Sequence, residues 1–216
     1  MQHYKPGIET KNKILQAAKS CFYTCGYQKA TVSKIAEIAD VPQSLVAYYF
    51  KKDQLLQQVH ADYIVMILNT IDEQVGGLIE NILQRHLLMQ QMQYLGIYSD
   101  EKNYSIYRYM VEHGLLSPRI FEIVDTYLLD SAKEFGVDID PDTFRMYIAA
   151  QYGAHRELVR VYLKEFDPEK SKPLFYFTGT IALRLAGVSG SIIEKNISKA
   201  EVLLARIDMS KIRFLS

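Results

Sequence analysis

One stretch of twenty residues, Thr31–Phe50, constrains the fold of this chain more than any other: TVSKIAEIADVPQSLVAYYF. Thr31 is placed to cap a short helix over 32–39, and a second short helix over 43–49 follows a turn of only three residues. Helices joined so tightly cross at a steep angle, and Ala36 is small enough to lie at the crossing. The stretch therefore predicts a helix-turn-helix, whose second helix typically enters the major groove of DNA.

The side chains of this stretch divide into an inner and an outer set. The inner set is apolar and would form a seam between the helices, closed against the preceding helix: Ile35, Ala39, Val41, Val46, and Tyr49 or Phe50. The outer set lies on the second helix, where base edges and phosphates would be met: Gln43, Ser44 and Tyr48. Glutamine can form two hydrogen bonds with adenine, whereas hydroxyl and lysine side chains mostly bind the phosphate backbone.

The remaining sequence also predicts helices, so the expected fold class is all-α. No convincing run with a period of two is bounded by turn residues, as a strand would be. Breakers separate the other expected helices, which cover 7–25, 53–75, 78–97, 103–114, 118–135, 141–166, 171–187 and 190–208. Gly26 is placed to end the first of them, and Asp140-Pro141 is a good start for the longest.

Charge is distributed unevenly along a chain whose formal net charge is zero. Residues 1–60 contain eight lysines and four acidic residues, a positive surplus that the rest of the chain balances. A basic head on an acidic body indicates a polyanion partner for the head, although so small a surplus can also arise by chance. No apolar run is long enough for a membrane span and the first residues lack a signal core, so we expect a cytoplasmic protein without a membrane partner.

No set of residues predicts catalysis, a metal site or a cofactor. Phosphate-binding glycine loops, nucleophile motifs and zinc-protease motifs are all missing. Cys21 and Cys25 share one helix face, but two thiolates make at most half of a zinc site, and no complementary pair exists. We therefore expect both cysteines to be buried as small apolar side chains.

A series of short motifs stands in fixed register over residues 10–56: ILQAA, then F and GY, then T-V-x-x-I-A, V-x-x-x-x-V-x-Y-x-F and K-D-Q-L. In this register the segment resembles the TetR family of bacterial transcriptional regulators. The resemblance implies an all-helical dimer, with a helix-turn-helix DNA-binding domain at 1–52 and a larger effector-binding and dimerisation domain at 53–216. After about residue 60 the match is one of length and helicity alone.

This sequence departs from the family pattern at three places. Asp40 stands where the turn usually has glycine; aspartate tolerates a left-handed conformation at a cost on the order of 1 kcal/mol. Pro42 stands where serine usually caps the recognition helix; proline suits a helix start but has no hydroxyl or amide hydrogen for a phosphate. The chain is also one residue short between Phe50 and KDQL, which leaves the placement of Lys51 and Lys52 open.

The resemblance assigns two kinds of DNA contact, residue by residue. Contacts to base edges and the groove fall to Gln43, Ser44 and Tyr48. Contacts to phosphates fall to Thr31, Ser33, Lys34, Tyr49 and Lys52. Two of these have a competing interpretation: Tyr49 as a lid on the core, and Lys34 as a solvated side chain on the outer face of its helix.

Candidate ligand-binding residues come from helical patterns in the body and are guesses. Gln151 and His155 interrupt an apolar stripe in 141–166, so they are either core polar groups satisfied by neighbours or part of a ligand cavity. Tyr109 and His113 share one face of their helix, and other tyrosines nearby in sequence could add rings with hydroxyl tips: Tyr94, Tyr98, Tyr107, Tyr147 and Tyr152. The ligand-binding candidates are Tyr94, Tyr109, His113, Gln151 and His155, although aromatic stripes more often belong to a core.

The last two expected helices, 171–187 and 190–208, carry apolar faces with small residues that allow close approach. Two copies of this hairpin would form an isologous four-helix bundle, so we expect a homodimer through residues 171–208. Packing within the same chain is the alternative.

These patterns and the resemblance predict a ligand-responsive transcriptional regulator. It would be a repressor that binds a palindromic operator as a homodimer, with recognition helices about 34–36 Å apart, and that a small-molecule effector releases. One alternative is a helical enzyme or small-molecule carrier that uses the tyrosine-rich body and keeps the N-terminal motif as a scaffold. Another is a protein-interaction module that binds through the tyrosine-rich faces.

Overall fold

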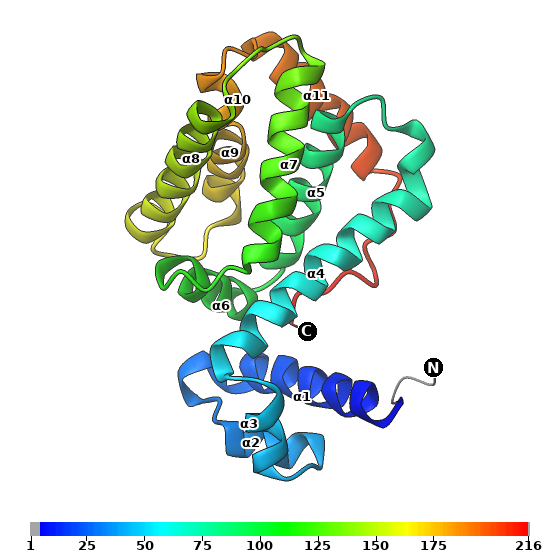
Figure 1. Ribbon diagram of the computed structural model, residues 1–216, viewed down its shortest axis with the longest axis vertical. Coiled ribbons are helices and arrows are strands. Elements are labelled where there is room, and N and C mark those ends of the chain that lie inside the picture. Colours follow the sequence, from blue (N-terminus) through cyan, green and yellow to red (C-terminus); the bar gives the residue numbers. More distant parts are fainter. Residues whose placement is uncertain (1–4, 216) are drawn as a thin grey trace.

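The computed structural model describes residues 5–215, and every regular element in this range is a helix (Figure 1). The predicted all-α class is therefore confirmed. The elements are α1 (Lys5–Lys29), α2 (Val32–Ala39), α3 (Gln43–Tyr49), α4 (Lys52–Val75), the 3₁₀ turn η1 (Gly76–Leu78), α5 (Ile82–Ile97), α6 (Glu101–Glu112), α7 (Pro118–Glu134), α8 (Pro141–Val161), α9 (Pro168–Gly179), α10 (Ile181–Leu185) and α11 (Gly190–Leu204). Within the described residues no helix is both long and apolar enough to span a bilayer.

We call α1–α3 the head and α5–α11 the body; α4 joins them (Figure 1). Both helices of the predicted helix-turn-helix, α2 and α3, begin and end at the residues expected from the sequence. Thr31 caps α2, because its Oγ1 accepts the backbone N–H of Lys34 at 3.2 Å. In α1 the helical geometry is interrupted at Gly26, with φ 75° and ψ 161°, where the sequence predicted the end of the first helix.

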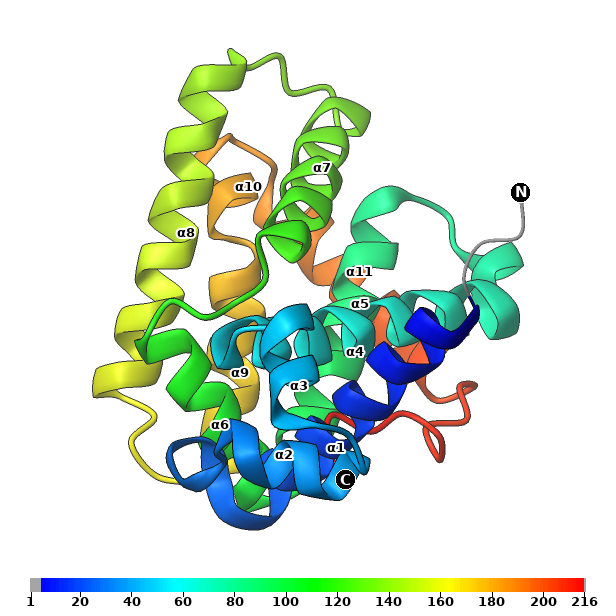
Figure 2. The ribbon, with the colours of Figure 1, turned by 60° about the horizontal axis from the view of Figure 1, so that its bottom comes forward.

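The head contacts the body directly, beside the helix that joins them. α1 packs against both α4 and α6, and Figure 2 shows α1 near α6 from below. The ring of Tyr27 lies 4.6 Å from that of Tyr109 on α6. On the other side, Nζ of Lys19 donates to the backbone oxygen of Arg213 at 3.2 Å. The junction is therefore packed at more than one point.

The joining helix α4 begins at Lys52, one residue earlier than expected. The N–H of Lys51 donates to Oε1 of Gln54 at 2.8 Å, a bond that helps to start the helix. Because α4 runs without interruption from the head into the body, the division into domains 1–52 and 53–216 stays a prediction.

α5 is the central helix of the body, with α4, α7, α9 and α11 packed around it. It is buried on almost every side, as is typical of a helix enclosed by others. α8 contacts α6, α9 and α10 at the edge of the body (Figure 2). The apolar residues of α11 are buried in this chain, where the helix packs on α5: Ile193, Ile197, Ala200 and Leu203. For this helix, packing within the chain occupies the face that the sequence offered to a second copy.

Several helices of the body begin or end away from the predicted residues, because side-chain caps set their ends. α5 begins at Ile82, four residues later than predicted, since Oδ1 of Asn81 accepts a backbone N–H at 2.8 Å. α6 begins two residues early, since Asp100 caps it in the same way at 2.9 Å. α8 and α11 end early, at Val161 and Leu204.

The predicted helix over 171–187 is in fact two helices, α9 and α10, separated at Thr180. The break leaves backbone N–H groups free at the start of α10. Oε1 of Gln151 on α8 accepts the N–H of Ala182 at 3.0 Å. A buried side chain from another helix thus stabilises a break that the apolar pattern alone does not reveal.

Candidate nucleic-acid interface and ligand cavity

The tight crossing of α2 and α3 is closed to solvent. Ile35 and Val46 are fully buried, and Ala36 is only 4% exposed. Since α2 and α3 pack directly on each other, a larger side chain at Ala36 would push them apart. Ala36 is buried in α2, which is compatible with its predicted place at the crossing.

The turn between the two helices has a regular geometry in spite of its unusual sequence. Asp40 has φ 52° and ψ 52°, and it is the one non-glycine residue with positive φ in the range 5–215. The N–H of Asp40 donates to the oxygen of Glu37 at 3.2 Å, and that of Val41 to the oxygen of Ala36 at 3.1 Å. These are the two bonds of a Schellman motif, in which glycine is the usual left-handed residue. Pro42 then precedes α3 without a side-chain cap.

The outer side of α3 presents the side chains predicted to reach base edges. Gln43, Ser44 and Tyr48 are all exposed, Tyr48 by 80%. The Tyr48 ring stands edge-on to the Tyr49 ring, with centroids 5.1 Å apart. So exposed an aromatic side chain, on a helix whose opposite side is buried, is available to a partner.

The start of α2 carries three of the predicted phosphate contacts. Thr31, Ser33 and Lys34 are all exposed. Because Thr31 caps the helix through its oxygen, its O–H remains able to donate to a phosphate. Nζ of Lys34 donates to the backbone oxygen of Lys29 at 3.2 Å, a surface bond that a phosphate can replace.

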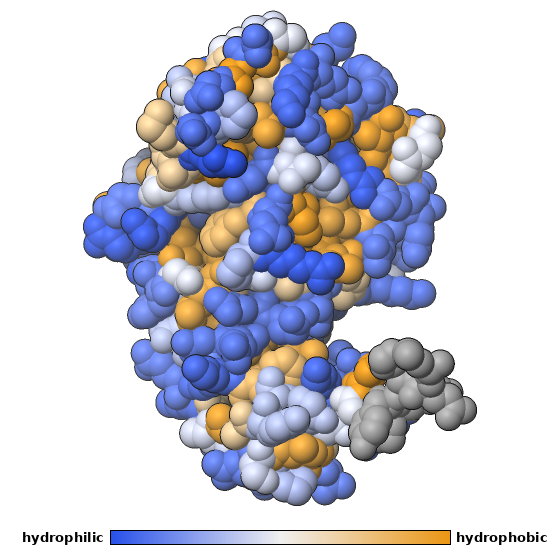
Figure 3. Space-filling view, in the orientation of Figure 1, coloured by the Kyte–Doolittle hydropathy of each residue, from blue (hydrophilic) through white to orange (hydrophobic). Residues whose placement is uncertain are grey.

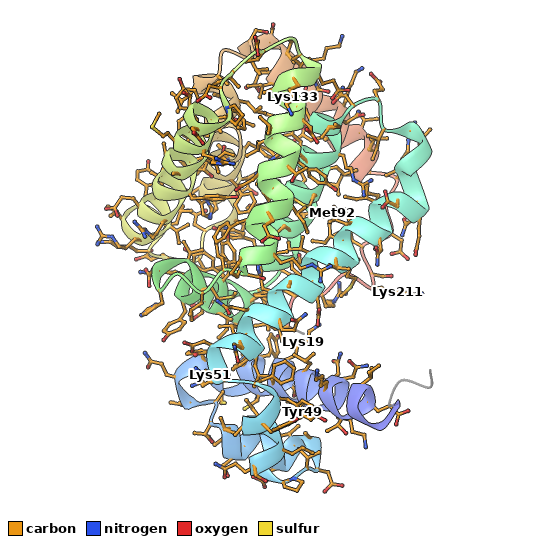
Figure 4. The ribbon with its side chains drawn as sticks, viewed as in Figure 1. Lys19, Tyr49, Lys51, Met92, Lys133 and Lys211 are labelled. Carbon is orange, nitrogen blue, oxygen red and sulfur yellow. The ribbon has the colours of Figure 1, made fainter. Side chains whose placement is uncertain are left out.

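The other two predicted phosphate contacts are Tyr49 at the end of α3, labelled in Figure 4, and Lys52 at the start of α4. Tyr49 is half-buried, and Nζ of Lys11 lies 5.2 Å from its ring centroid, so part of the ring packs within the head. Nζ of Lys52 lies 4.1 Å from the ring centroid of Tyr27. Lys51 is exposed. The sequence left the placement of Lys51 and Lys52 open. In the structure the Lys51 side chain is exposed, whereas the ammonium of Lys52 rests on the ring of Tyr27.

A cavity of about 80 Å³ lies in the body, walled by α5, α7, α8 and α9 with single residues from α4 and α6. Two of the five ligand-binding candidates, Gln151 and His155, line it. Nε2 of His155 lies 2.9 Å from the Tyr107 hydroxyl, and its Nδ1 lies 3.1 Å from Oγ1 of Thr178. Burial lowers the pKa of His155 to about 4, so the ring is neutral at pH 7. These two residues are therefore satisfied within the core and also face a cavity.

The other three candidates lie away from the cavity wall. Tyr94 is buried beside Tyr98, and its hydroxyl donates to the backbone oxygen of Pro168. Tyr109 and His113 stack on each other with ring centroids 4.0 Å apart, on the side of α6 that meets the head. Helical spacing grouped these residues by face, but it does not say which face of α5 or α6 turns towards the cavity.

Three polar residues of the wall escaped the sequence analysis: His60 on α4, and Gln90 and Gln93 on α5. Nε2 of His60 lies 3.3 Å from Nε2 of Gln93, and burial lowers the pKa of His60 to about 4. The run LLMQQMQY in α5 is the feature of the sequence that could have indicated the two glutamines. A helix enclosed on all sides keeps glutamines only where they find partners or a cavity.

A larger space of about 340 Å³ adjoins the cavity beside α7 and α8. The two spaces share four lining residues: Leu116, Phe121, Tyr152 and His155. The rings of Phe121 and Tyr152 pack edge-on with centroids 4.5 Å apart, and the Tyr152 hydroxyl donates to Asp125 at 2.7 Å. Figure 3 shows apolar surface between α7 and α8, two helices that line both spaces.

The cysteine pair shows no sign of metal chemistry. Cys21 is buried and Cys25 half-buried, both are free thiols, and their Sγ atoms lie 3.7 Å apart. Burial raises the pKa of the Cys21 thiol to about 11, which makes it unreactive. Among the residues that the structure describes, no group of three or more histidine, cysteine or acidic side chains could hold a metal ion.

Comparison with known proteins agrees with this arrangement of head and body. Residues 14–59 match the family model of bacterial regulatory proteins, tetR family. The probable HTH-type transcriptional regulator YttP of Bacillus subtilis (strain 168) is 26% identical over 134 residues. That alignment covers 62% of this chain and 64% of YttP, so it spans less than two thirds of the relative.

Solved structures share the fold along most of the chain. RolR in complex with resorcinol superposes with a TM-score of 0.64 at 17% identity, over 89% of this chain and 95% of that one. FadR of Bacillus subtilis in complex with stearoyl-CoA gives a TM-score of 0.50 at 16% identity, over 83% and 99%. The fatty acid degradation regulator FadR of Bacillus halodurans gives 0.50 at 19%, over 78% and 97%. At such identities the likeness concerns the fold alone.

Proposed function

We propose that this chain, a member of the TetR family of bacterial transcriptional regulators, is a ligand-responsive repressor that binds a palindromic operator as a homodimer. The head would bind double-stranded DNA, and a small molecule in the body would release it. Because bacterial DNA lies in the cytoplasm, the protein would act there. Its relatives are regulators, and we propose no enzymatic activity for it.

The observation that carries this proposal is the outer side of α3. Gln43, Ser44 and Tyr48 project into solvent, while Val46 on the opposite side is fully buried. A side chain with both an amide donor and an amide acceptor at the start of a recognition helix suits direct contact with a base. Thr31, Ser33, Lys34, Tyr49 and Lys52 would fix the head on the phosphates around it.

A palindromic operator requires two heads related by two-fold symmetry. We assign the dimer interface to residues 171–208, which is supported by apolar side chains exposed there. Phe177 and Leu185 are 50% and 51% exposed, and Val202 is 60% exposed. Since α5 occupies the inner face of α11, the outer sides of α9, α10 and α11 would meet the second copy, with recognition helices about 34–36 Å apart.

The cavity is well placed to influence the head, because His60 in its wall belongs to α4. A ligand that prefers one position of His60 would favour one tilt of α4 and thus one separation of the two heads. The switch depends on unequal binding to the two states, and a nearly complete reversal needs about 5.5 kcal/mol of difference.

Selection of bound sequences from random double-stranded DNA tests the proposal. The expected result is a palindrome whose half-sites are about 10 base pairs apart, centre to centre. The double variant Gln43→Ala/Tyr48→Ala, in which only exposed side chains change, is the matched control and should lose the enrichment. Enrichment of no common sequence, or of the same sequences by the variant, would contradict the proposal.

A further inference from the structure

Two polar atoms of side chains that line the cavity have no hydrogen-bond partner among residues 5–215: Nδ1 of His60 and Oε1 of Gln90. Both side chains are buried, His60 with 1% and Gln90 with 9% of its surface exposed. Buried polar groups in native proteins are almost always paired. Two unpaired atoms at one cavity therefore indicate a partner that comes from outside the chain.

The surroundings of each side chain define what its free atom offers. With the amide of Gln93 oriented so that its nitrogen donates to Nε2 of His60, 3.3 Å away, the ring proton is assigned to Nδ1. Gln90 lies against the backbone of Gly179, where an added Cβ would come within 1.9 Å of its Nε2. The wall thus offers one free donor, from His60, and one free acceptor, from Gln90.

The cavity wall is uncharged at neutral pH. None of the described residues that line it is an aspartate, glutamate, lysine or arginine. Burial lowers the pKa of His60 and His155 to about 4, so both rings are neutral. Within this cavity a charged ligand would lose its hydration without meeting a counter-ion, since Arg156 lines only the adjoining space.

The size and the rings of the wall suit a flat molecule. Aromatic side chains reach the cavity from four helices: Tyr107, Phe121, Tyr152 and Phe175. The cavity of about 80 Å³ shares four lining residues with the adjoining space of about 340 Å³, whose wall also includes Arg156. An apolar cavity of about 150 Å³ is known to hold benzene, so the cavity together with the adjoining space has room for one ring with short substituents.

We propose that the effector of this regulator is an uncharged molecule with a single aromatic ring and at least one hydroxyl group. Its O–H would donate to Oε1 of Gln90, and a lone pair on its oxygen would accept from Nδ1 of His60. The inference rests on the function proposed above only in calling the ligand an effector; the binding site itself does not depend on DNA.

Calorimetric titration of the full chain without DNA tests the ligand class with three matched probes. Phenol has the ring and the hydroxyl, toluene replaces the hydroxyl by a methyl group, and benzoate adds a negative charge. We expect phenol to bind at least tenfold more tightly than toluene, and benzoate not to bind. Equal binding of phenol and toluene, binding of benzoate, or no binding of phenol would each overturn the proposal.

Two neighbouring glutamines on α5 locate the site. Gln90→Met keeps the length of the side chain and removes the unpaired oxygen, so it should raise the thermal midpoint of the unliganded protein and weaken phenol binding at least tenfold. Gln91 also has a buried oxygen without a partner, but it does not line the cavity. Gln91→Met should therefore leave phenol binding unchanged. Equal effects of the two variants on phenol binding would contradict the assignment of Gln90.

DNA binding, measured separately, distinguishes failure of this inference from failure of the proposed function. Phenol binding that depends on Gln90, in a protein with no preferred DNA sequence, would support the ligand site and contradict the repressor. A selected operator together with no phenol binding would contradict the ligand class alone.

Discussion

At the scale of single residues, sequence-specific recognition is expected to depend most on Gln43. Its side chain is exposed at the start of α3 and can pair with adenine. Gln43→Ala should weaken operator binding by about 1–3 kcal/mol and relax the preference at one base pair of each half-site. Fluorescence anisotropy on the operator and on its single-pair variants measures both effects. Gln16→Ala, an exposed change on α1, is the control, and an equal loss on every sequence would make Gln43 a phosphate contact.

Lys52 is expected to act through charge alone. Its ammonium rests on the ring of Tyr27 beside the recognition helix. Lys52→Ala should weaken binding to all DNA sequences and reduce the dependence of log K on log salt by about 1. Lys52→Arg keeps the charge and should restore that slope. If the alanine variant keeps the parent's salt dependence, Lys52 does not contact a phosphate.

The left-handed residue of the turn gives a prediction about stability. Asp40 adopts φ 52° at the end of α2, where a residue with a plain Cβ is strained. Asp40→Ala should lower the free energy of unfolding by about 1 kcal/mol, whereas Asp40→Gly, which adopts the left-handed conformation without strain, should not lower it. Urea titration measures both. Equal losses in the two variants would mean that the backbone conformation is not the cause.

At the scale of helices, the contact between α4 and α5 depends on one glycine. A Cβ at Gly96 would lie 2.0 Å from the hydroxyl of Tyr63, which donates to the backbone oxygen of Met92 at 3.2 Å. Gly96→Ala should therefore lower the free energy of unfolding by about 1–3 kcal/mol. Adding Tyr63→Phe removes the nearest atom and should recover part of the loss. Denaturant titrations measure the free energy of unfolding of the single and double variants. If the two single changes simply add up in the double variant, Gly96 and Tyr63 do not interact as described.

The helices that the sequence predicted to the residue are those whose ends are set locally. α2 and α3 are bounded by Thr31, the turn at Asp40, and Pro42, all within the motif itself. In the body, the break between α9 and α10 involves Gln151, which is distant in sequence. Such a contact exists only after the helices have packed, so periodicity could not anticipate it.

At the scale of the whole molecule, three histidines, on α4, α5 and α8, couple stability to pH. Burial lowers the pKa of His60, His86 and His155 to about 4, below the ordinary 6.5. Between these values the unfolded chain binds more protons than the folded one, so the free energy of unfolding falls as pH falls from 6.5 to 4. Each histidine contributes at most about 1.4 kcal/mol per pH unit.

Urea titrations between pH 7 and 4.5 measure this slope. His86→Phe should reduce it by about one third, because one of three contributions is removed. Leu88→Ala, a fully buried change without a titrating group, should lower stability at every pH and leave the slope as it was. A slope that His86→Phe does not alter would show that the proton uptake occurs elsewhere.

The DNA-binding face could be predicted from the sequence more completely than the cavity, because its residues are contiguous in the chain. The outer face of α3 follows from twenty contiguous residues, so Gln43, Ser44 and Tyr48 could be named in advance as exposed. The cavity needs six helices in their final positions. Gln151 and His155 were marked by an interrupted apolar stripe, whereas His60 and Gln90 become visible only when α4 and α5 are packed.

The hydrogen bond from Lys19 to the backbone of Arg213 has a practical consequence. It ties α1 to residues near the C-terminal end without passing through α4, and Figure 4 shows Lys19 and Lys211 near this junction. Any swing of the head must change the spacing there, far from both the nucleobases and the ligand. Spin labels at Ser20, the exposed neighbour of Lys19, and at Lys211 would leave this bond in place and would report the distance between the head and the C-terminal residues.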